Sequence, residues 1–281
     1  MPTMPNTIGY IINEGISVES DANIIADNGR RVLAEGVLQD LGVKNRNGRI
    51  YEVADIKPEI MGPRMTELIN AGYFRGESGH PTGADATNLA RQQTIDPSNV
   101  CVQFTKIWLE GNIVKGQFKG TNNRLGEDFN QDLLDGCKPA FSLRALGTIE
   151  TKGGNNYVKN IKIITYDHVI YPSHKVAYTT HLVKESAGSD PVIKDITKKH
   201  AYCANESGFL LPVTNESVMS YIKTESANIK SIMESFDVLY ESMSLIDNGT
   251  KVQLVDRSGD ILVINLETKI QNDIYSYCSN I

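Results

Sequence analysis

Two β-rich runs joined by a turn constrain the fold of this chain more than any other feature. Residues 139–150 read PAFSLRALGTIE, and residues 157–171 read YVKNIKIITYDHVIY. Both runs carry many of the β-branched and aromatic side chains that strands favour. Residues 153–156, between them, form the turn cluster Gly-Gly-Asn-Asn. The sequence therefore predicts a β-hairpin over this region.

Shorter runs add further strands and one helix. Strands are predicted at TIGYIIN (7–13), RRVLAEGVLQ (30–39), VCVQFTKIWLE (100–110) and IVKGQFKG (113–120). The Gly111-Asn112 dipeptide predicts a turn between the last two of these strands. Apolar residues recur at helical spacing from Leu125 to Leu134, and Gly136 and Pro139 beyond them are typical of a helix end. A short amphipathic helix is expected there.

The composition shifts at the polar connector ESAGSDP, which begins at Glu185. We therefore expect one domain over residues 1–184 and a C-terminal appendage over residues 185–281. Within the appendage, apolar spacing predicts a helix across residues 217–246. A strand, an Arg-Ser-Gly-Asp turn and a second strand are expected over residues 251–267, followed by a short polar helix near the end. The expected fold class is α+β.

Composition and charge exclude several classes of function. Hydrophobic residues make up 40% of the chain and charged residues 22%, which is ordinary for a soluble globular protein. No apolar run approaches the roughly 18 residues needed to span a bilayer, and the start of the chain lacks the pattern of a secretory signal. A net charge of −6 with dispersed basic residues argues against nucleic-acid binding. We expect a cytosolic protein whose four cysteines are buried thiols: Cys101, Cys137, Cys203 and Cys278.

The residues that could carry chemistry are scattered along the chain. No P-loop, dinucleotide fingerprint, zinc-binding H-E-x-x-H or nucleophile elbow is present. What stands out is His80 in the turn-like stretch GESGHP, Ser142 in the first run of the predicted hairpin, and Asp167 and His168 in the second. These residue types can supply the nucleophile, base and orienting acid of a serine hydrolase, but spacing does not show that they converge. A metal-dependent hydrolase built on His80, Asp167 and His168 is an alternative.

Four segments in order resemble the prohead proteases of large tailed bacteriophages, serine peptidases related in fold to the herpesvirus assemblins. They are VLQDLGVKNRNGRIY (37–51), GESGHP (76–81), DGCKPAFSLRALG (135–147) and ITYDHVIYPSHKVA (164–177). The resemblance covers about residues 7 to 182 and implies a mostly β, assemblin-like barrel surrounded by helices. It also implies a serine endopeptidase that needs neither metal nor organic cofactor.

The same resemblance implies roles for individual residues. The G-x-x-x-H-P turn makes His80 the general base, and the S-x-R strand makes Ser142 the nucleophile. Arg144 then falls where the family places a residue that serves the oxyanion, through its main-chain N–H or its guanidinium. Asp167 is the expected third member of the triad, with His168 or His174 as alternatives because herpesvirus relatives use a second histidine.

The roles of two charged stretches near these motifs each have two interpretations. Glu77 either lies close enough to His80 to favour its protonated form or, as we prefer, faces solvent. The stretch KNRNGRIY is expected to be a structural turn, with contact between Arg46 or Arg49 and an acidic substrate residue as the alternative.

The implied substrates are the scaffold proteins and the amino-terminal segments of capsid proteins inside the phage prohead. The protease itself would be made in the host cytoplasm and act inside the prohead. Prohead proteases of this kind often cut after glutamate, so self-cleavage after Glu35, Glu234 or Glu241 is a hypothesis. Self-association is possible in this family, and no membrane or nucleic-acid partner is expected. A non-catalytic scaffold or capsid-assembly protein with the same fold is the main alternative function.

Overall fold

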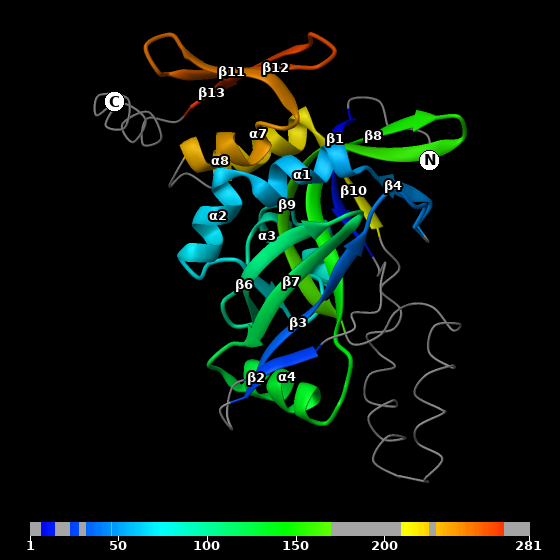
Figure 1. Cartoon of the computed structure of the whole chain (residues 1–281). Helices are drawn as coiled ribbons and strands as arrows, with labels where there is room; N and C mark the ends of the chain where they lie inside the picture. Colours follow the sequence, from blue (N-terminus) through cyan, green and yellow to red (C-terminus); the bar gives the residue numbers. More distant parts are fainter. Residues whose placement is uncertain are drawn as a thin grey trace.

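The computed structural model describes residues 7–14, 23–27, 32–45, 47–169, 209–224 and 229–266. It shows a mixed α+β protein rich in strands, which confirms the expected class (Figure 1). The strands are β1 (Thr7–Asn13), β2 (Asn23–Asp27), β3 (Val32–Asp40), β4 (Arg49–Tyr51), β5 (Arg75–Glu77), β6 (Val100–Glu110), β7 (Ile113–Gly120), β8 (Ala140–Lys152), β9 (Asn155–Val169), β10 (Phe209–Thr214), β11 (Tyr240–Ile246), β12 (Lys251–Asp256) and β13 (Ile261–Asn265). The helices are α1 (Val53–Met61), α2 (Pro63–Asn70), the 3-10 turn η1 (Gly83–Thr87), α3 (Leu89–Gln93), α4 (Arg124–Leu134), α7 (Asn215–Thr224) and α8 (Ile229–Phe236).

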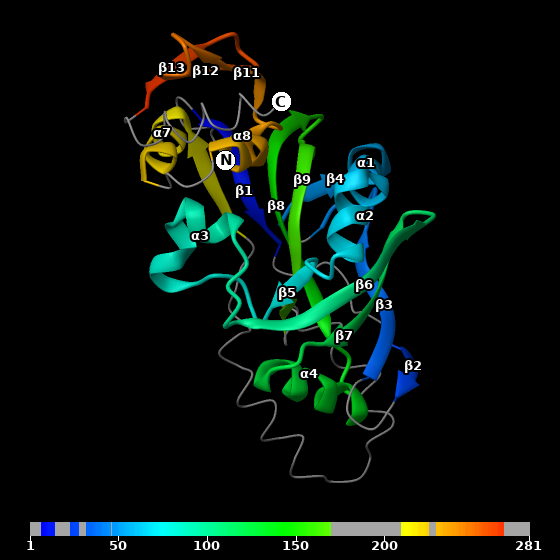
Figure 2. The same cartoon turned by 90° about the vertical axis from the view of Figure 1, so that its left-hand side faces the viewer.

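The predicted hairpin is the β8–β9 pair, which runs through the middle of the molecule (Figure 2). It lies in a five-stranded sheet of order β10-β1-β8-β9-β4. Neighbouring strands of this sheet pair in antiparallel fashion, except that β4 pairs with β9 in parallel. The hairpin turn is made by Gly153 and Gly154, both at positive φ, a conformation that glycine adopts without strain. Since β8 and β9 carry Ser142 and Asp167, this sheet positions the site.

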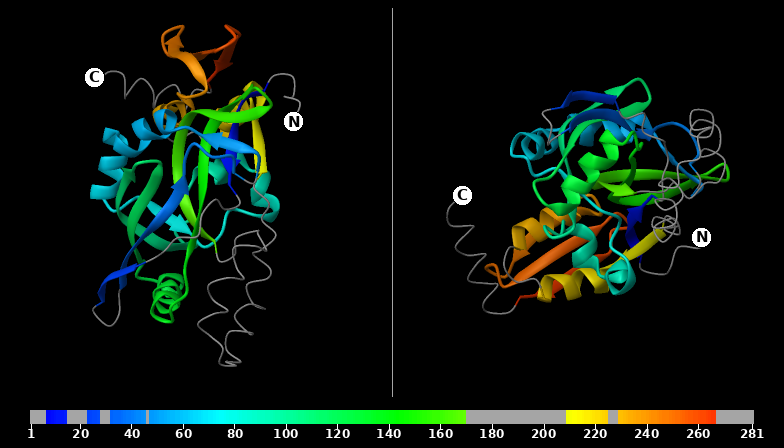
Figure 3. Two further views of the ribbon diagram at one scale, coloured as in Figure 1. Left: turned by 45° about the vertical axis from the view of Figure 1, so that its right-hand side comes forward. Right: turned by 90° about the horizontal axis from the view of Figure 1, so that it is seen from below.

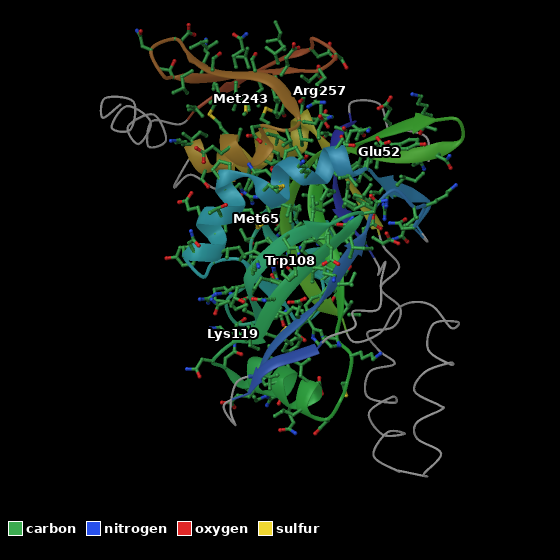
Figure 4. All side chains as sticks on the ribbon, in the orientation of Figure 1. Glu52, Met65, Trp108, Lys119, Met243 and Arg257 are labelled. Carbon is green, nitrogen blue, oxygen red and sulfur yellow. The ribbon has the colours of Figure 1, made fainter. Side chains whose placement is uncertain are left out.

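A second five-stranded sheet, of order β2-β3-β7-β6-β5, packs against the first. The main core lies between them, and its centre is a cluster of aromatic rings in which Phe104 lies 5.2 Å from Phe74 and 5.4 Å from Phe141. Met65 of α2, labelled in Figure 4, is buried in the same core. Because Phe141 is held in this cluster, the next side chain along β8, Ser142, is directed to the other face of the strand.

The two sheets meet at one corner, where the chain leaves β5. Ser78 forms a parallel bridge with His168 of β9, and the Gly79 N–H donates to the His168 carbonyl at 2.8 Å. Gly76 allows this close approach, since a Cβ on it would lie 2.2 Å from the Tyr166 carbonyl oxygen. The stretch GESGHP is therefore a short strand followed by a turn, with Gly79 at φ 86°.

The C-terminal part adds a second core on the other face of the first sheet. Helices α7 and α8 lie against that face, and above them is a three-stranded sheet of order β11-β12-β13 (Figures 1 and 3). This core joins Ile11 of β1 and Leu146 of β8 to apolar residues of the helices, among them Ile222 and Phe236. Strand β10 also pairs with β1, so residues 209–214 extend the first sheet.

The helix predicted across residues 217–246 is wrong in its last part. Residues 240–246 form β11, which pairs with β12 through the turn at residues 247–250. The apolar residues of that stretch look helical in spacing, but the turn following them allows a cross-strand ladder instead. Two other predictions, the boundary between residues 184 and 185 and the short helix near the end, lie outside the described residues. Among the described helices, none combines the length and apolar character that crossing a bilayer requires.

Candidate active site

Ser142 and Asp167 are brought together by the register of the hairpin. They are direct partners in the β8–β9 ladder. Side chains of directly opposed residues in an antiparallel pair lie on the same face, with Cβ atoms about 4.5–5.5 Å apart. Both side chains are buried, Ser142 with 1% and Asp167 with 0% of its surface exposed. The two residues are 25 positions apart in sequence, yet the turn between their strands sets their separation.

His80 completes the group from a different element. The chain enters from β5, turns at Gly79 and presents the His80 ring between the two hairpin residues. Its Nδ1 lies 2.7 Å from Oδ2 of Asp167, and its Nε2 lies 2.5 Å from Oγ of Ser142. An ionised carboxylate only accepts hydrogen bonds, so Nδ1 carries the proton when it bonds to Asp167. The lone pair of Nε2 can then accept the serine proton.

The Asp167 carboxylate is held by four groups. Besides His80, its Oδ1 accepts from the main-chain N–H of Glu77 at 3.0 Å and from Nη2 of Arg144 at 3.1 Å. Nε of Arg144 lies 3.0 Å from its Oδ2. Burial alone would raise the pKa of Asp167, but the charge of Arg144, the contact with His80 and the Glu77 N–H together outweigh burial and lower that pKa. Asp167 is therefore ionised at neutral pH.

We expected Glu77 to face solvent, and this expectation is wrong: its side chain is completely buried. Its Oε1 accepts from Nη2 of Arg144 at 2.9 Å, and both oxygens pair with Arg91 of α3. It also accepts from the main-chain N–H of Asp96 and from Asn99. Burial raises the pKa of Glu77, but the hydrogen bonds from Arg91 and the charge of Arg144 bring it below its usual value. The sequence held no signal for this, because the cations that stabilise Glu77 come from other elements.

Arg144 is the largest fully buried side chain of the described residues, not a residue at the surface. In addition to the two carboxylates, its Nη1 donates to the carbonyls of Gln92 and Thr94 at 3.4 and 3.2 Å. The guanidinium thus contacts Asp167, Glu77 and the end of α3. The structure places the arginine expected to serve the oxyanion directly behind the candidate triad.

Of the two alternative third members, the structure describes His168. The ring of His168, next to Asp167 on β9, packs edge-on against Phe129 with the ring centres 4.8 Å apart. Successive residues of a strand point to opposite faces, which separates His168 from the Asp167 face. His174 lies outside the described residues. Asp167, by contrast, is bonded to His80.

A second buried carboxylate, Glu14, borders the site. Its carbonyl oxygen lies 3.4 Å from Nε2 of His80, and its carboxylate accepts from Asn45 and Asn47 at 2.9 and 2.6 Å. Arg49 pairs with it at 2.7 Å, and Tyr51 donates to it. Burial, and then the charge of Glu14, raise the pKa of Tyr51, so its phenol stays protonated as a donor.

The stretch KNRNGRIY thus binds a carboxylate of its own chain, consistent with the structural role that we expected. Arg46 lies outside the described residues. Glu14 was not among the expected site residues, because a single glutamate after a strand carries no signal of what will bind it.

The cysteines that the structure describes form no disulfide. Cys101 and Cys137 are free thiols, and Cys203 and Cys278 lie outside the described residues. Burial raises the pKa of the Cys101 thiol, which makes it unreactive. Within the part of the chain that the structure describes, no cluster of three or more His, Cys, Asp or Glu side chains is arranged to hold a metal ion.

Comparison with known proteins gives the family. The sequence model of the peptidase S80 family matches residues 21–236. Among solved structures, the capsid assembly protease of bacteriophage T4 is similar, with 19% identity over 57% of this chain and 94% of that one and a TM-score of 0.43. No curated protein matches the chain in sequence. The family match spans well over half of the 281 residues and agrees with the resemblance seen in the sequence. The chain belongs to the peptidase S80 family.

Proposed function

We propose that this peptidase is a serine endopeptidase, with Ser142 as nucleophile, His80 as general base and Asp167 as the acid that orients His80. One observation carries the proposal: the His80 ring lies 2.5 Å from the Ser142 hydroxyl on one side and 2.7 Å from the Asp167 carboxylate on the other. These are the contacts that a serine nucleophile requires, since the base must reach the hydroxyl while a third group fixes its tautomer.

The reaction follows from these contacts. Oγ of Ser142 attacks the carbonyl carbon of the scissile peptide while Nε2 of His80 takes the hydroxyl proton. The C–N bond then breaks, the leaving amine receives that proton, and the acyl group stays on Ser142 as an ester. Water, deprotonated by His80, attacks the ester, and the proton returns to Oγ as the acid product leaves. Asp167 stays ionised throughout and stabilises the imidazolium that forms at each step.

The substrates are the scaffold and capsid proteins of a phage prohead, and the enzyme acts inside that shell during capsid maturation. The family and the four prohead-protease motifs support this assignment. We further propose that the two five-stranded sheets, with α1, α2 and α4 around them, form the assemblin-like protease domain, and that α7, α8 and the β11–β13 sheet belong to a C-terminal appendage. We also propose that the protein associates with copies of itself, as the family resemblance implies.

Self-cleavage after the three predicted glutamates requires local opening. Glu35 lies within β3, which is paired on both sides, Glu234 lies in α8, and Glu241 lies in β11. A protease binds its substrate in an extended form at the scissile bond, so a residue held in a helix or in a strand paired with a neighbour is a poor substrate. Any cleavage there is expected to be slow in the folded protein.

The test uses a mixture of synthetic peptides that contain glutamate, with product ends mapped by mass spectrometry. Wild type is expected to release fragments, a large share of them ending in glutamate, and to do so equally with or without EDTA. Ser142→Ala should release none above background. Equal cleavage by Ser142→Ala would exclude the proposed nucleophile, and loss of activity with EDTA would favour the metal-dependent alternative.

A further inference from the structure

A continuous chain of charges leads from the molecular surface to the candidate base. Arg91 of α3 is the outermost member, with 16% of its side chain exposed, and Glu77, Arg144 and Asp167 behind it are fully buried. We name these four residues the buried charge chain. Each carboxylate contacts a guanidinium, and Arg144 contacts both carboxylates. With all four groups ionised, two positive and two negative charges cancel.

The order of the contacts gives each member a different task. Arg144 holds both oxygens of Asp167, the carboxylate that His80 must find in one fixed orientation. Glu77 in turn fixes Arg144 with a 2.9 Å bond, and its own main-chain N–H donates to Asp167. Isolated charges are strongly disfavoured when buried, so each member stays ionised because of its neighbour.

We propose that Arg144 and Glu77 are positioning residues, which act through Asp167 to set both the orientation of His80 and the pH at which it can accept a proton. This inference rests on the proposed function, because it assigns the work of residues behind Ser142 and His80. It also gives the Arg144 guanidinium a different task from the oxyanion contact that the resemblance implies.

The inference predicts opposite pH effects for two neutral substitutions. His80 accepts the serine proton only when it is unprotonated. Glu77→Gln removes a negative charge behind Asp167, which makes the protonated His80 ring less stable. The acidic limb of the pH–rate profile, where the rate falls as the ring becomes protonated, then moves to lower pH. Arg144→Met removes a positive charge and moves that limb to higher pH. Damage to packing alone would not shift the two variants in opposite directions.

The other titratable groups around the buried charge chain are the same in every variant. Asp85 and Asp96 lie 3.8 and 4.0 Å from Arg91 on its outer side. The Cys101 thiol of β6 lies near Asp167 and Glu77 and stays neutral, and Glu14 contacts His80 through its carbonyl. Because none of them is changed, a shift of the acidic limb reports the substituted charge.

The experiment measures the rate at which a fluorophosphonate probe labels the protein between pH 4 and 9. Labelling forms the Oγ–P bond of Ser142, expels fluoride and passes the serine proton to His80, so its rate follows the base without any peptide substrate. We expect the midpoint of the acidic limb to move by about one pH unit, downward in Glu77→Gln and upward in Arg144→Met. Both variants should also label more slowly than wild type.

Two further variants complete the design. Arg144→Lys keeps the charge but loses the planar contact, so its limb should stay near that of wild type while its rate falls. Glu59→Gln is the matched control, because Glu59 pairs with Arg64 and accepts from Ile163 away from Asp167, and it should match wild type. Wild type that fails to label at Ser142 would overturn the proposed function. If wild type labels at Ser142 and all variants with native circular dichroism share one midpoint of the acidic limb, this inference alone is overturned. If Arg144→Met does not fold, the comparison of the midpoints of Glu77→Gln and Arg144→Lys tests the inference instead.

Discussion

Ser142 and Asp167 are cross-strand partners, set directly opposite each other in the β8–β9 ladder. Two of the three candidate catalytic side chains are thus fixed by the register of one hairpin, and the third is supplied by the corner where β5 meets β9. A slip of one residue in that register would turn one of the two side chains to the opposite face. The aromatic core behind Phe141 opposes such a slip, because it would expose a buried ring.

Replacing the orienting acid should impair catalysis far more than folding. In Asp167→Asn an amide replaces the carboxylate, so the preferred tautomer of His80 and the stabilisation of its cation are both lost. We expect kcat to fall by about three to four orders of magnitude. Peptide cleavage followed by mass spectrometry measures this loss.

The neighbouring histidine provides the matched comparison. His168→Phe keeps an aromatic ring against Phe129, on the opposite face of β9 from Asp167, so kcat should stay within a few-fold of wild type. A large loss in His168→Phe together with a small one in Asp167→Asn would reverse the assignment of the third residue.

Acid should unfold the protein through Asp167 and Glu77. The pKa of each is lowered in the folded state, so the unfolded chain, with ordinary values of about 3.9 and 4.3, binds protons first as pH falls. The stability that they contribute is complete above those unfolded values and is lost as pH falls through the lower folded ones. We expect urea unfolding to show a free energy that falls below about pH 4, by up to about 1.4 kcal/mol per pH unit for each group. Glu77→Gln should show a shallower fall, and a free energy that rises on acidification from pH 5 to 3 would contradict the assignment.

Gly76 tests how tightly the corner must close. An added Cβ would lie 2.2 Å from the Tyr166 carbonyl oxygen and 2.7 Å from Val102, so β5 must move away from β9. We expect Gly76→Ala to lower the free energy of unfolding by about 2–3 kcal/mol and to slow labelling of Ser142, because His80 follows β5. Gly83→Ala is the control: it has φ +62° and open space, so it should cost about 1 kcal/mol from strain and leave labelling unchanged. Equal rates of labelling in the two variants would refute the link between the corner and His80.

Arg49 and Glu14 should behave as a buried pair. Arg49→Met leaves the Glu14 carboxylate buried without its cation, which we expect to lower the free energy of unfolding by about 3–5 kcal/mol. Adding Glu14→Gln should recover part of that loss, since the uncompensated charge is gone. A double-mutant cycle by urea unfolding measures the coupling, and additive effects would show that the two side chains do not depend on each other.

Local patterns were enough to predict the elements that carry the site. The hairpin of β8 and β9, the β6–β7 pair and α4 each have a turn or stop signal beside a periodic run, so their existence follows from short stretches of sequence. The helix α1 was missed because Pro58 lies inside it and Gly62 and Pro63 follow, all residues that normally interrupt helices. In residues 240–246 the apolar spacing suited a helix, and the pairing with β12 prevailed.

The charges behind the site are beyond such reasoning. Glu77 lies in a glycine-rich stretch that looks exposed, and its burial depends on Arg91 from α3 and Arg144 from β8. The residues around Arg144 likewise look like those around an ordinary arginine in a strand. Only the fold brings Asp167 beside it. Whether a charged side chain is buried depends on partners that the fold brings from distant positions, so single-sequence patterns do not reveal it.

The most direct test of the account is the covalent labelling of Ser142. Wild type, treated with a fluorophosphonate probe at neutral pH and analysed by intact mass and peptide mapping, should gain one label on Ser142, and Ser142→Ala should gain none. A preparation that cleaves peptides while Ser142 stays unlabelled, or a Ser142→Ala variant that cleaves them as fast as wild type, would contradict the serine mechanism.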